Sequence, residues 1–414
     1  MGSKRLLAQR GANVPAAVNG SDTNSGSRAT AWVVPRPGTG GWCSKSFHRR
    51  SILNPVSASS LPFLRLSGSP RAQGRQHGEA LRKSIGDVRD RWRESLTQRF
   101  GVHPDSFIET FLAQTRFVAA IRHWSPALLE EIEGIAEGSG RSLPETLAFQ
   151  FMDEEWWFGA KHYRQAAAEA DHCSIIASRG RDGQPPILAQ NMDLRAYLDG
   201  GQALISTAIN GGPRTTVMTI CGMIGLCGAN EAGVGVAVNT LWQLPSAADG
   251  LPVACVMRGI LEQPNLAAAT KWIRQPRHAS GQHYLIGDPG GFASFEASAT
   301  RVSSIPWNDS PVFVHTNHPV MAPRNERLEK AEENSRGRYA KLCDLLATKT
   351  PTVDEVKAAL SSREGPHPIS VRPLATDATS TMTFASIVME LKRPPTIQLA
   401  GGPPCLNAYC PIGW

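Results

Sequence analysis

The 414-residue sequence contains no run of eighteen consecutive apolar residues, so it predicts no transmembrane helix. It has eight cysteines, and no two of them form a Cys-x-x-Cys pair. No histidine lies beside them at zinc-ligand spacing, which argues against a structural metal site. A chain this long with so few cysteines is not a disulfide scaffold. We therefore expect no metal, no cofactor and mostly buried thiols in a reducing compartment, the cytoplasm.

Acidic residues are nearly missing from the first seventy positions. This segment carries nine Lys or Arg against one acid, Asp22, and is rich in Ser, Gly, Pro and Ala. The net charge of +7 therefore belongs to it, since residues 71–414 carry a net charge of about −1. Such a composition buries too little apolar surface to fold, and it also resembles an organelle transit peptide. We expect residues 1–70 to be a disordered or targeting extension.

Nucleotide-binding signals are also lacking. The glycines between Gly222 and Gly235 form neither a P-loop nor a dinucleotide fingerprint, and we interpret them as hairpin turns. The basic extension lacks the interleaved aromatic residues of a nucleic-acid platform, so we expect no nucleic-acid partner.

From residue 71 onward apolar residues recur at three- and four-residue steps, which predicts helices. The pattern covers four segments: Glu79–Phe100, a helix marked by apolar residues between Phe107 and Val118, Pro126–Ala136, and a segment that begins at Ser142 and runs to Trp156. Ser142 and Glu145 have the spacing of a capping box. We expect residues 71–172 to form a helical pro-segment.

From Cys173 onward the period changes to two, which predicts strands. The expected strands are Cys173–Ser178, Ile187–Asn191, Ala203–Ile209, Thr215–Cys221, Val234–Asn239, His283–Gly287, Ala293–Ala297, Val312–His315, Phe384–Lys392 and Thr396–Leu399. The helices between them are expected at Pro252–Leu261, Leu266–Arg274, Arg324–Leu346 and Val353–Leu360. Strands, a helical block and strands again favour an α+β fold of two antiparallel sheets packed face to face and covered by helices. A doubly wound parallel sheet fits less well because strands and helices do not alternate.

Cys173 begins the first expected strand. A cysteine in such a place is most often a small buried apolar residue. It can instead be a nucleophile if a nearby group takes its proton. Cleavage of the preceding peptide bond would free an α-amine with a pKa of about 7.7–8.0, close to its own thiol, and this amine could act as a general base.

Four segments occur in an order and spacing that bear on this choice. They are Asp171–Ala177, Gln190–Asp193, Gly222–Asn239 and Val314–His318. Together they resemble the self-processing acyl-coenzyme A:6-aminopenicillanate acyltransferase family, which lies within the N-terminal-nucleophile (Ntn) hydrolases, close to the choloylglycine hydrolases. Upstream, Gly74–Gly78 and Glu130–Gly138 resemble the family's helical α-chain, so the similarity covers roughly residues 71–400.

This resemblance implies an αββα sandwich, autoproteolysis at the His172–Cys173 bond and a thioester on Cys173. Residues 173–414 would form the catalytic β-chain, held with the α-chain as a heterodimer. The family enzyme that makes penicillin has Gly before its cysteine, whereas this chain has His172.

The resemblance also assigns roles to other residues. Asp193 would hold and polarise the freed α-amine, although Asn191–Asp193 also suits a strand-end turn. Asn317 resembles the oxyanion-hole asparagine, and oxyanion donors are worth on the order of 3 kcal/mol each. Asn239 is placed like an asparagine of the choloylglycine branch or is a hairpin-turn residue, and Arg372 is placed like a basic residue that supports the nucleophile or is an ordinary surface arginine. His315 and His318 lack zinc-site spacing, so they are expected to shape the pocket.

The expected partners are a small-molecule acyl donor, either an acyl-coenzyme A or an N-acyl amide, and an amine or water as acceptor. The competing hypothesis is a non-catalytic scaffold or binding protein that keeps the Ntn sandwich. Such a protein has no particular need for Cys173, Asp193 and Asn317 together.

Overall fold

The computed structural model describes residues 61–163, 172–181, 183–208, 211–308, 310–321, 329–346, 350–374 and 380–414. All of them belong to the larger of two units of the chain, residues 52–414. The first sixty residues, and with them most of the predicted extension, lie outside the described part.

The N-terminal part of the described chain, residues 61–163, is mainly helical, as predicted. Its helices are α1 (Pro70–Ala80), α2 (Arg82–Phe100), α3 (Pro104–Gln114), α4 (Phe117–Trp124), α5 (Pro126–Ser139), α6 (Leu143–Gln150) and α7 (Met152–His162). The segment predicted from Ser142 to Trp156 is two helices, because the chain breaks at Phe151, which caps α6. The hydroxyl of Ser142 accepts the N–H of Glu145 at 3.3 Å, which is one of the two bonds of the predicted capping box.

Helices α1 and α5 pack so closely that glycines are required between them. A Cβ atom at Gly134 in α5 would lie 2.1 Å from the carbonyl oxygen of Arg71 in α1. A Cβ atom at Gly74, Gly78 or Gly138 would likewise lie less than 3.0 Å from backbone atoms of the facing helix. The close approach explains why glycines recur four residues apart in both helical segments.

The strands form two sheets. The first has the order β1-β4-β5-β6-β7-β8-β9-β10, and the second has the order β11-β2-β3-β12-β13-β14. The first sheet consists of β1 (Phe63–Arg65), β4 (Gln202–Thr207), β5 (Thr215–Ile220), β6 (Cys227–Asn230), β7 (Gly235–Thr240), β8 (Gln282–Asp288), β9 (Gly291–Ala297) and β10 (Val302–Ile305). The second consists of β2 (Cys173–Ser178), β3 (Ile187–Arg195), β11 (Val312–His315), β12 (Thr381–Glu390), β13 (Thr396–Ala400) and β14 (Cys410–Ile412). A 3-10 turn, η2 (Ala196–Leu198), follows β3. Pairing is antiparallel throughout the described strands, except between β1 and β4.

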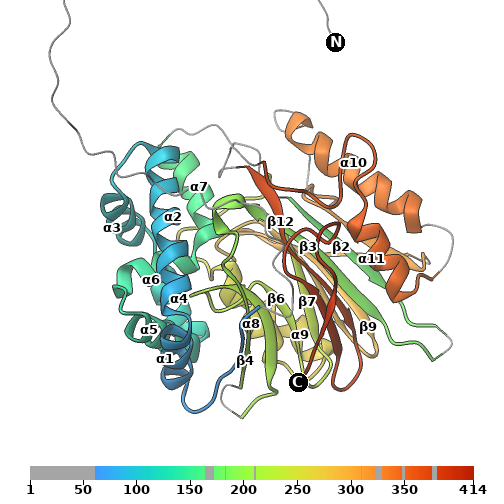
Figure 1. The fold of residues 1–414 in the computed structure, drawn as a ribbon, viewed down its shortest axis with the longest axis horizontal. Coiled ribbons are helices and arrows are strands. Elements are labelled where there is room, and N and C mark those ends of the chain that lie inside the picture. The colour runs from blue at the N-terminus through green and yellow to red at the C-terminus, as the bar shows by residue number, and fades with distance from the viewer. Residues whose placement is uncertain are drawn as a thin grey trace, which may run out of the picture. The chain divides into compact units, whose positions relative to one another are not determined.

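The two sheets lie face to face, with β7 of the first against β2 and β3 of the second. Helices α8 (Val253–Leu261) and α9 (Leu266–Trp272) cover strands β6 to β9 of the first sheet. Helices α10 (Glu329–Leu346) and α11 (Val353–Ser361) cover β11, β3 and β12 of the second (Figure 1). The layers are therefore helix, sheet, sheet and helix, which confirms the predicted α+β sandwich.

Four short strands were not predicted: β1, β6, β10 and β14. Each has three or four residues, too few for a period of two to stand out. Strand β1 also corrects the predicted extension, because Phe63–Arg65 pairs with β4 and α1 begins at Pro70. The prediction that residues 1–70 lie outside the fold is therefore wrong for residues 61–70. Residues 324–328 of the predicted helix Arg324–Leu346 lie outside the described part.

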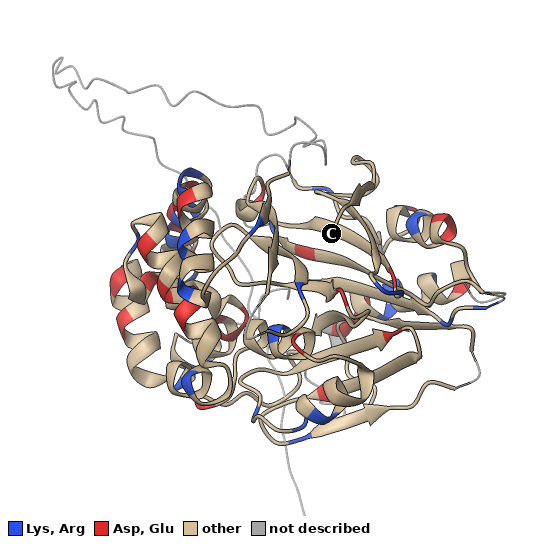
Figure 2. Cartoon of the chain, turned by 90° about the horizontal axis from the view of Figure 1, so that it is seen from below, with Lys and Arg blue, Asp and Glu red and all other residues tan. Residues whose placement is uncertain are grey.

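Charged residues are concentrated on the helices, with both signs mixed, and the strands carry few of them (Figure 2). Within the described part of the chain, no helix is both long and apolar enough to cross a membrane. The same residues contain no cluster of three His, Cys, Asp or Glu side chains that could hold a metal ion.

Candidate active site

Cys173 is the first residue of β2, a strand that lies between β11 and β3 in the second sheet. It is 5% exposed and stands directly opposite Met192 of β3. Both side chains belong to the hydrophobic core between the two sheets. The residue thus faces the sandwich interior at the point where the chain enters the sheet.

The peptide bond before Cys173 has hydrogen-bond partners on both of its polar groups. The backbone N–H of Asp193 donates to the carbonyl oxygen of His172 at 2.9 Å. The N–H of Cys173 donates to Oδ1 of Asn317 at 2.7 Å. The first bond continues the β2–β3 ladder, whereas the second requires a side chain from the segment that follows β11.

His172 itself is half-buried. Desolvation lowers the pKa of its imidazole to about 3, and the nearby charges of Arg338 and Arg195 act in the same direction. The ring is therefore neutral at physiological pH.

Two donors also converge on the carbonyl oxygen of Cys173. Asn239, in β7 of the opposite sheet, donates from Nδ2 at 3.1 Å. Arg338, in α10, donates from Nη1 at 2.8 Å. The backbone on both sides of the Cys173 Cα is consequently held by side chains from three separate parts of the chain.

Arg338 is a functional candidate that sequence reasoning missed. Its side chain is fully buried, and it also donates to Oγ of Ser174 and to Oδ1 of Asn317, at 2.8 and 3.0 Å. Burial lowers the pKa of this guanidinium, and the charges of Asp193 and Cys173 partly offset that effect. One signal could have revealed it, since Arg338 lies in a buried helical stripe with Ser335 and Leu342, where a charged residue is unusual.

The amide of Asn317 has a single orientation that satisfies its partners. The Cys173 N–H and the Arg338 guanidinium can only donate, so both must face Oδ1. The carbonyl oxygen of Thr240 can only accept, and it lies 3.1 Å from Nδ2. One of the two hydrogens of Nδ2 is therefore used by Thr240, and the other remains for a further acceptor.

Asp193 is fully buried in β3. Side chains alternate along a strand, so Asp193 and Met192 point to opposite faces of the sheet. Met192 faces the first sheet together with Cys173, which places Asp193 on the face covered by α10. There its carboxylate is close enough to Arg338 to act on the pKa of that guanidinium.

Arg372 does not join this cluster. It is exposed and donates from Nε to Sγ of Cys405 at 3.4 Å. The place expected for a basic residue beside Cys173 is occupied by Arg338 instead. The short local match around Arg372 could not identify Arg338, because Arg338 reaches Cys173 from a different segment of the chain, helix α10.

The two predicted pocket histidines differ in their partners. His315 ends β11 and reaches Oδ1 of Asn239, with Nδ1 at 2.9 Å. His318 contacts the hydroxyl of Ser335 in α10 through Nδ1 at 2.8 Å. The fold brings Cys173, Asn239 and Asn317 into direct contact, and Asp193 lies near Arg338 on the other side of the same strands.

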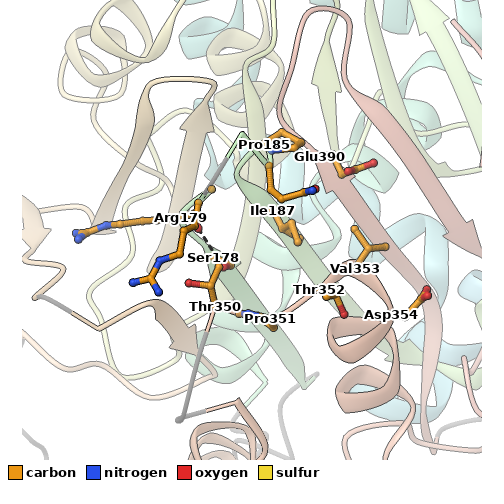
Figure 3. Close-up of a pocket in the computed structure, with 13 residues that line it drawn as sticks. Ser178, Arg179, Pro185, Ile187, Thr350, Pro351, Thr352, Val353, Asp354 and Glu390 are labelled. Atoms are coloured by element: carbon orange, nitrogen blue, oxygen red, sulfur yellow. Dashed lines mark hydrogen bonds between the residues drawn. The ribbon is translucent and has the colours of Figure 1, made fainter.

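A cavity of about 430 Å³ lies at the other end of the same strands (Figure 3). Ser178, Ile187 and Glu390, which line it, stand at the far ends of β2, β3 and β12. Ser178 is five residues from Cys173, which is about 16 Å along a strand. This cavity is therefore separate from the cluster around Cys173.

The structure is an αββα sandwich with Cys173 at the head of an inner strand. Comparison with known proteins gives the family. The chain belongs to the acyl-coenzyme A:6-aminopenicillanic acid acyl-transferase family, whose model matches residues 178–402, more than half of the chain. The match begins five residues after Cys173 and includes the segments that carry Asp193, Asn239, Asn317 and Arg338.

A curated relative supports the same assignment. It is the 40 kDa form of acyl-coenzyme A:6-aminopenicillanic-acid-acyltransferase from Emericella nidulans, 25% identical over 307 residues, which cover 73% of this chain and 82% of the relative. Two solved structures are more distant. A mutant conjugated bile acid hydrolase from Clostridium perfringens is 13% identical with a TM-score of 0.41, and covers 58% of this chain and 97% of its own. Penicillin V acylase from Agrobacterium tumefaciens is 14% identical with a TM-score of 0.37, and covers 55% and 83%. Both TM-scores are below 0.5, so the fold assignment rests on the strand order of the chain itself.

Proposed function

We propose that this chain is an autoprocessed cysteine acyltransferase or amidohydrolase. Cys173 forms an acyl thioester and passes the acyl group to an amine or to water. The observation that carries the proposal is the side-chain environment of one residue: Asn317, Asn239 and Arg338 all bind the backbone of Cys173. An ordinary buried cysteine at the head of a strand needs no such set of polar partners.

The first step is cleavage of the His172–Cys173 bond. The Cys173 thiolate attacks the carbonyl carbon of His172, and the C–N bond breaks as the amide nitrogen takes up a proton and becomes the α-amine. Water then hydrolyses the resulting thioester, releasing the carboxylate of His172 and regenerating the thiol. The N–H of Asp193 already donates to the oxygen on which negative charge develops during the attack.

The second step is acyl transfer. The freed α-amine takes the thiol proton, the thiolate attacks the acyl carbonyl, and the amine returns the proton to the leaving group, which is either a coenzyme A thiol or an amine. Water or a second amine then attacks the thioester, and its proton passes to the departing sulfur by way of the same α-amine. The remaining hydrogen on Asn317 Nδ2, and Nδ2 of Asn239, supply the donors for the tetrahedral oxyanion.

Asp193 and Arg338 support this chemistry from the α10 side of the sheet. Asp193 holds the α-amine, as the resemblance suggests. Arg338 takes the role first expected of Arg372: its positive charge lies beside Cys173 and favours the thiolate over the thiol. The contact between Arg338 and Oδ1 of Asn317 also keeps the asparagine amide in one orientation. In that orientation Oδ1 faces the backbone nitrogen of Cys173, which becomes the α-amine.

The family and the named relative support acyl-coenzyme A or an N-acyl amide as the class of acyl donor. After cleavage the protein is a heterodimer of an α-chain that ends at His172 and a β-chain of residues 173–414. All seven cysteines of the described residues are free thiols, which suits a reducing compartment such as the cytoplasm.

The alternative is a non-catalytic protein that keeps the sandwich. Mass spectrometry of the purified protein separates the two hypotheses, because it reports chain cleavage and acyl adducts together. We expect wild type to give two chains that separate at residue 172, and a β-chain that gains the acyl mass on incubation with acyl-coenzyme A thioesters or N-acyl amides. Cys173→Ala should remain intact and unmodified, and Cys173→Ser should be cleaved slowly. A wild-type chain that stays whole and gains no mass would favour the scaffold.

A further inference from the structure

A row of polar residues crosses the inner face of the first sheet opposite Cys173. Asn239 of β7 stands directly across from His283 of β8, which stands directly across from Glu296 of β9. Directly paired residues lie on one face of a sheet, so the three side chains point the same way. His315 meets this row from β11 of the other sheet. All four side chains are at most 3% exposed.

The two imidazoles meet at one oxygen atom. Nδ1 of His283 and Nδ1 of His315 each lie 2.9 Å from Oδ1 of Asn239, and the rings stack with their centroids 3.5 Å apart. The other end of this amide, Nδ2, donates to the carbonyl of Cys173, so Oδ1 is the atom that faces the two rings. An amide oxygen only accepts, so each ring must present a donor to it. Both rings therefore carry their hydrogen on Nδ1.

The outer nitrogen of His283 is consistent with this assignment, and that of His315 lies beyond hydrogen-bond distance of its acidic neighbour. Nε2 of His283 lies 2.9 Å from the hydroxyl of Ser294, which can donate to it. Nε2 of His315 lies 3.9 Å from Oε1 of Glu296. Burial lowers the pKa of both imidazoles, and the Glu296 carboxylate only partly offsets that effect at His315. Each ring therefore carries a single hydrogen at neutral pH, on Nδ1.

Glu296 connects the row to the segment that bears Asn317. Its carboxylate accepts the backbone N–H groups of Val320 and Met321, three and four residues after Asn317. The two asparagines that contact Cys173 are thus tied to one buried network, from opposite ends.

We propose that His283 and His315 are positioning residues that fix the amide of Asn239 with Nδ2 towards Cys173. Nδ2 of Asn239 is thereby preorganised as a donor for the oxyanion. The amide does not rotate to present Oδ1, an oxygen that would repel the negative charge of the oxyanion. The role rests on the proposed function, since it concerns the reaction at Cys173. The hydrogen bonds between the two rings and Asn239 are a property of the folded protein and do not depend on catalysis.

Matched substitutions separate the hydrogen bond from the ring. Phe at position 283 or 315 keeps a stacked ring without a donor, whereas Asn places an N–H close to the position of Nδ1 and removes the ring. We expect His283→Phe and His315→Phe to lower kcat for acyl transfer about 10-fold or more, because loss of one oxyanion donor outright costs 10²–10³-fold. KM should change less than about twofold, since the donor acts in the transition state. His315→Asn should recover most of kcat.

A buried histidine outside the row provides the control. His278 is 1% exposed, and its Nε2 contacts the carbonyl oxygen of Ile273. His278→Phe should leave kcat near the wild-type value, and thermal melting of every variant shows whether the fold is intact.

Imidazole nitrogen NMR tests the pairing independently of catalysis. Both His283 and His315 should show the Nδ1–H tautomer, and an Nε2–H signal from either ring overturns the proposal. If wild type forms the acyl adduct and both Phe variants keep its kcat, the positioning role is wrong while the proposed function stands. If wild type forms no adduct, the proposed function is wrong, and the positioning role with it.

Discussion

Arg338 donates from Nη2 to Oδ1 of Asn317 at 3.0 Å, although α10 and the segment after β11 are separated by residues outside the described part. A guanidinium has no acceptor atom, so this contact allows only one orientation of the asparagine. The same oxygen receives the N–H of Cys173. Cys173, Asn317 and Arg338 therefore form one hydrogen-bonded unit, so a change at one member removes a partner of the other two.

The first prediction compares the two arginines. Arg338→Met should lower kcat for acyl transfer about 100-fold, because it removes the cation beside Cys173 and releases the amide of Asn317. Arg372→Met should change kcat less than about twofold, since Arg372 is exposed and contacts Cys405. Steady-state kinetics of the processed proteins gives both values. Equal losses in the two variants would contradict the assignment of this role to Arg338.

The second prediction separates the two steps at Cys173. The backbone N–H of Asp193 contacts the carbonyl oxygen of the His172–Cys173 peptide bond, and Asp193→Asn keeps that N–H. In the proposed function, the carboxylate of Asp193 is needed only after cleavage has produced the α-amine. We therefore expect Asp193→Asn to be cleaved at a rate within about 10-fold of wild type but to acylate at least 10-fold more slowly. Gel analysis of cleavage and mass spectrometry of the adduct measure the two steps, and an Asp193→Asn chain that remains whole would count against this division.

The third prediction concerns the α1–α5 contact. A Cβ at Gly134 would overlap the backbone of Arg71, so Gly134→Ala should destabilise the protein by about 1–3 kcal/mol or more. Gly86→Ala is the matched control, because its Cβ would meet only the flexible end of Arg141 at 3.1 Å. Alanine is favoured over glycine within a helix by up to about 1 kcal/mol, so this control should be neutral or stabilising. Chemical denaturation of the two variants measures the difference, which should vanish if the helices can move apart freely.

The fourth prediction concerns a buried carboxyl in α7. Desolvation, assisted by the neighbouring charge of Asp153, raises the pKa of Glu154 from 4.5 to about 8. Its Oε1 accepts the hydroxyl of Ser280 at 2.7 Å and the N–H of Val253 at 3.0 Å. The Glu154 carboxyl therefore binds its proton more tightly in the folded protein than in the unfolded chain.

The sign of the pH effect follows from that difference. Below pH 4.5 both states are protonated and Glu154 contributes no pH dependence. Between pH 4.5 and about 8 the unfolded chain loses the proton first, so stability falls as the pH rises, by up to about 1.4 kcal/mol per pH unit. Glu154→Gln cannot ionise and should lack this slope, so its melting temperature should exceed that of wild type by a margin that grows from pH 5 to pH 8. A margin independent of pH would show that Glu154 is ionised in the fold.

Much of the architecture was legible in the sequence because it depends on local periodicity. The change from a helical period to a period of two at Cys173 marked the boundary between α7 and β2. The Ser142/Glu145 pair marked the start of α6, where the Ser142 hydroxyl accepts the N–H of Glu145. Strands such as β6 and β10 were missed because four residues carry no clear period. Helix breaks at Leu81 and Phe151 were missed because the apolar pattern continues across them.

By itself, the sequence determined the αββα class, the place of Cys173 at the head of its strand, and the segments that bring Asp193, Asn239 and Asn317 towards it. The two packed sheets follow from the hydrophobic period, and the site residues follow from ordered motifs that resemble a known family. Only the tertiary structure decided that Arg338, not Arg372, lies beside Cys173, and that His283 and His315 share one oxygen of Asn239. Those contacts join residues from different sheets and from a helix packed on the sheet. Their geometry depends on strand register and helix packing, which no local sequence pattern records.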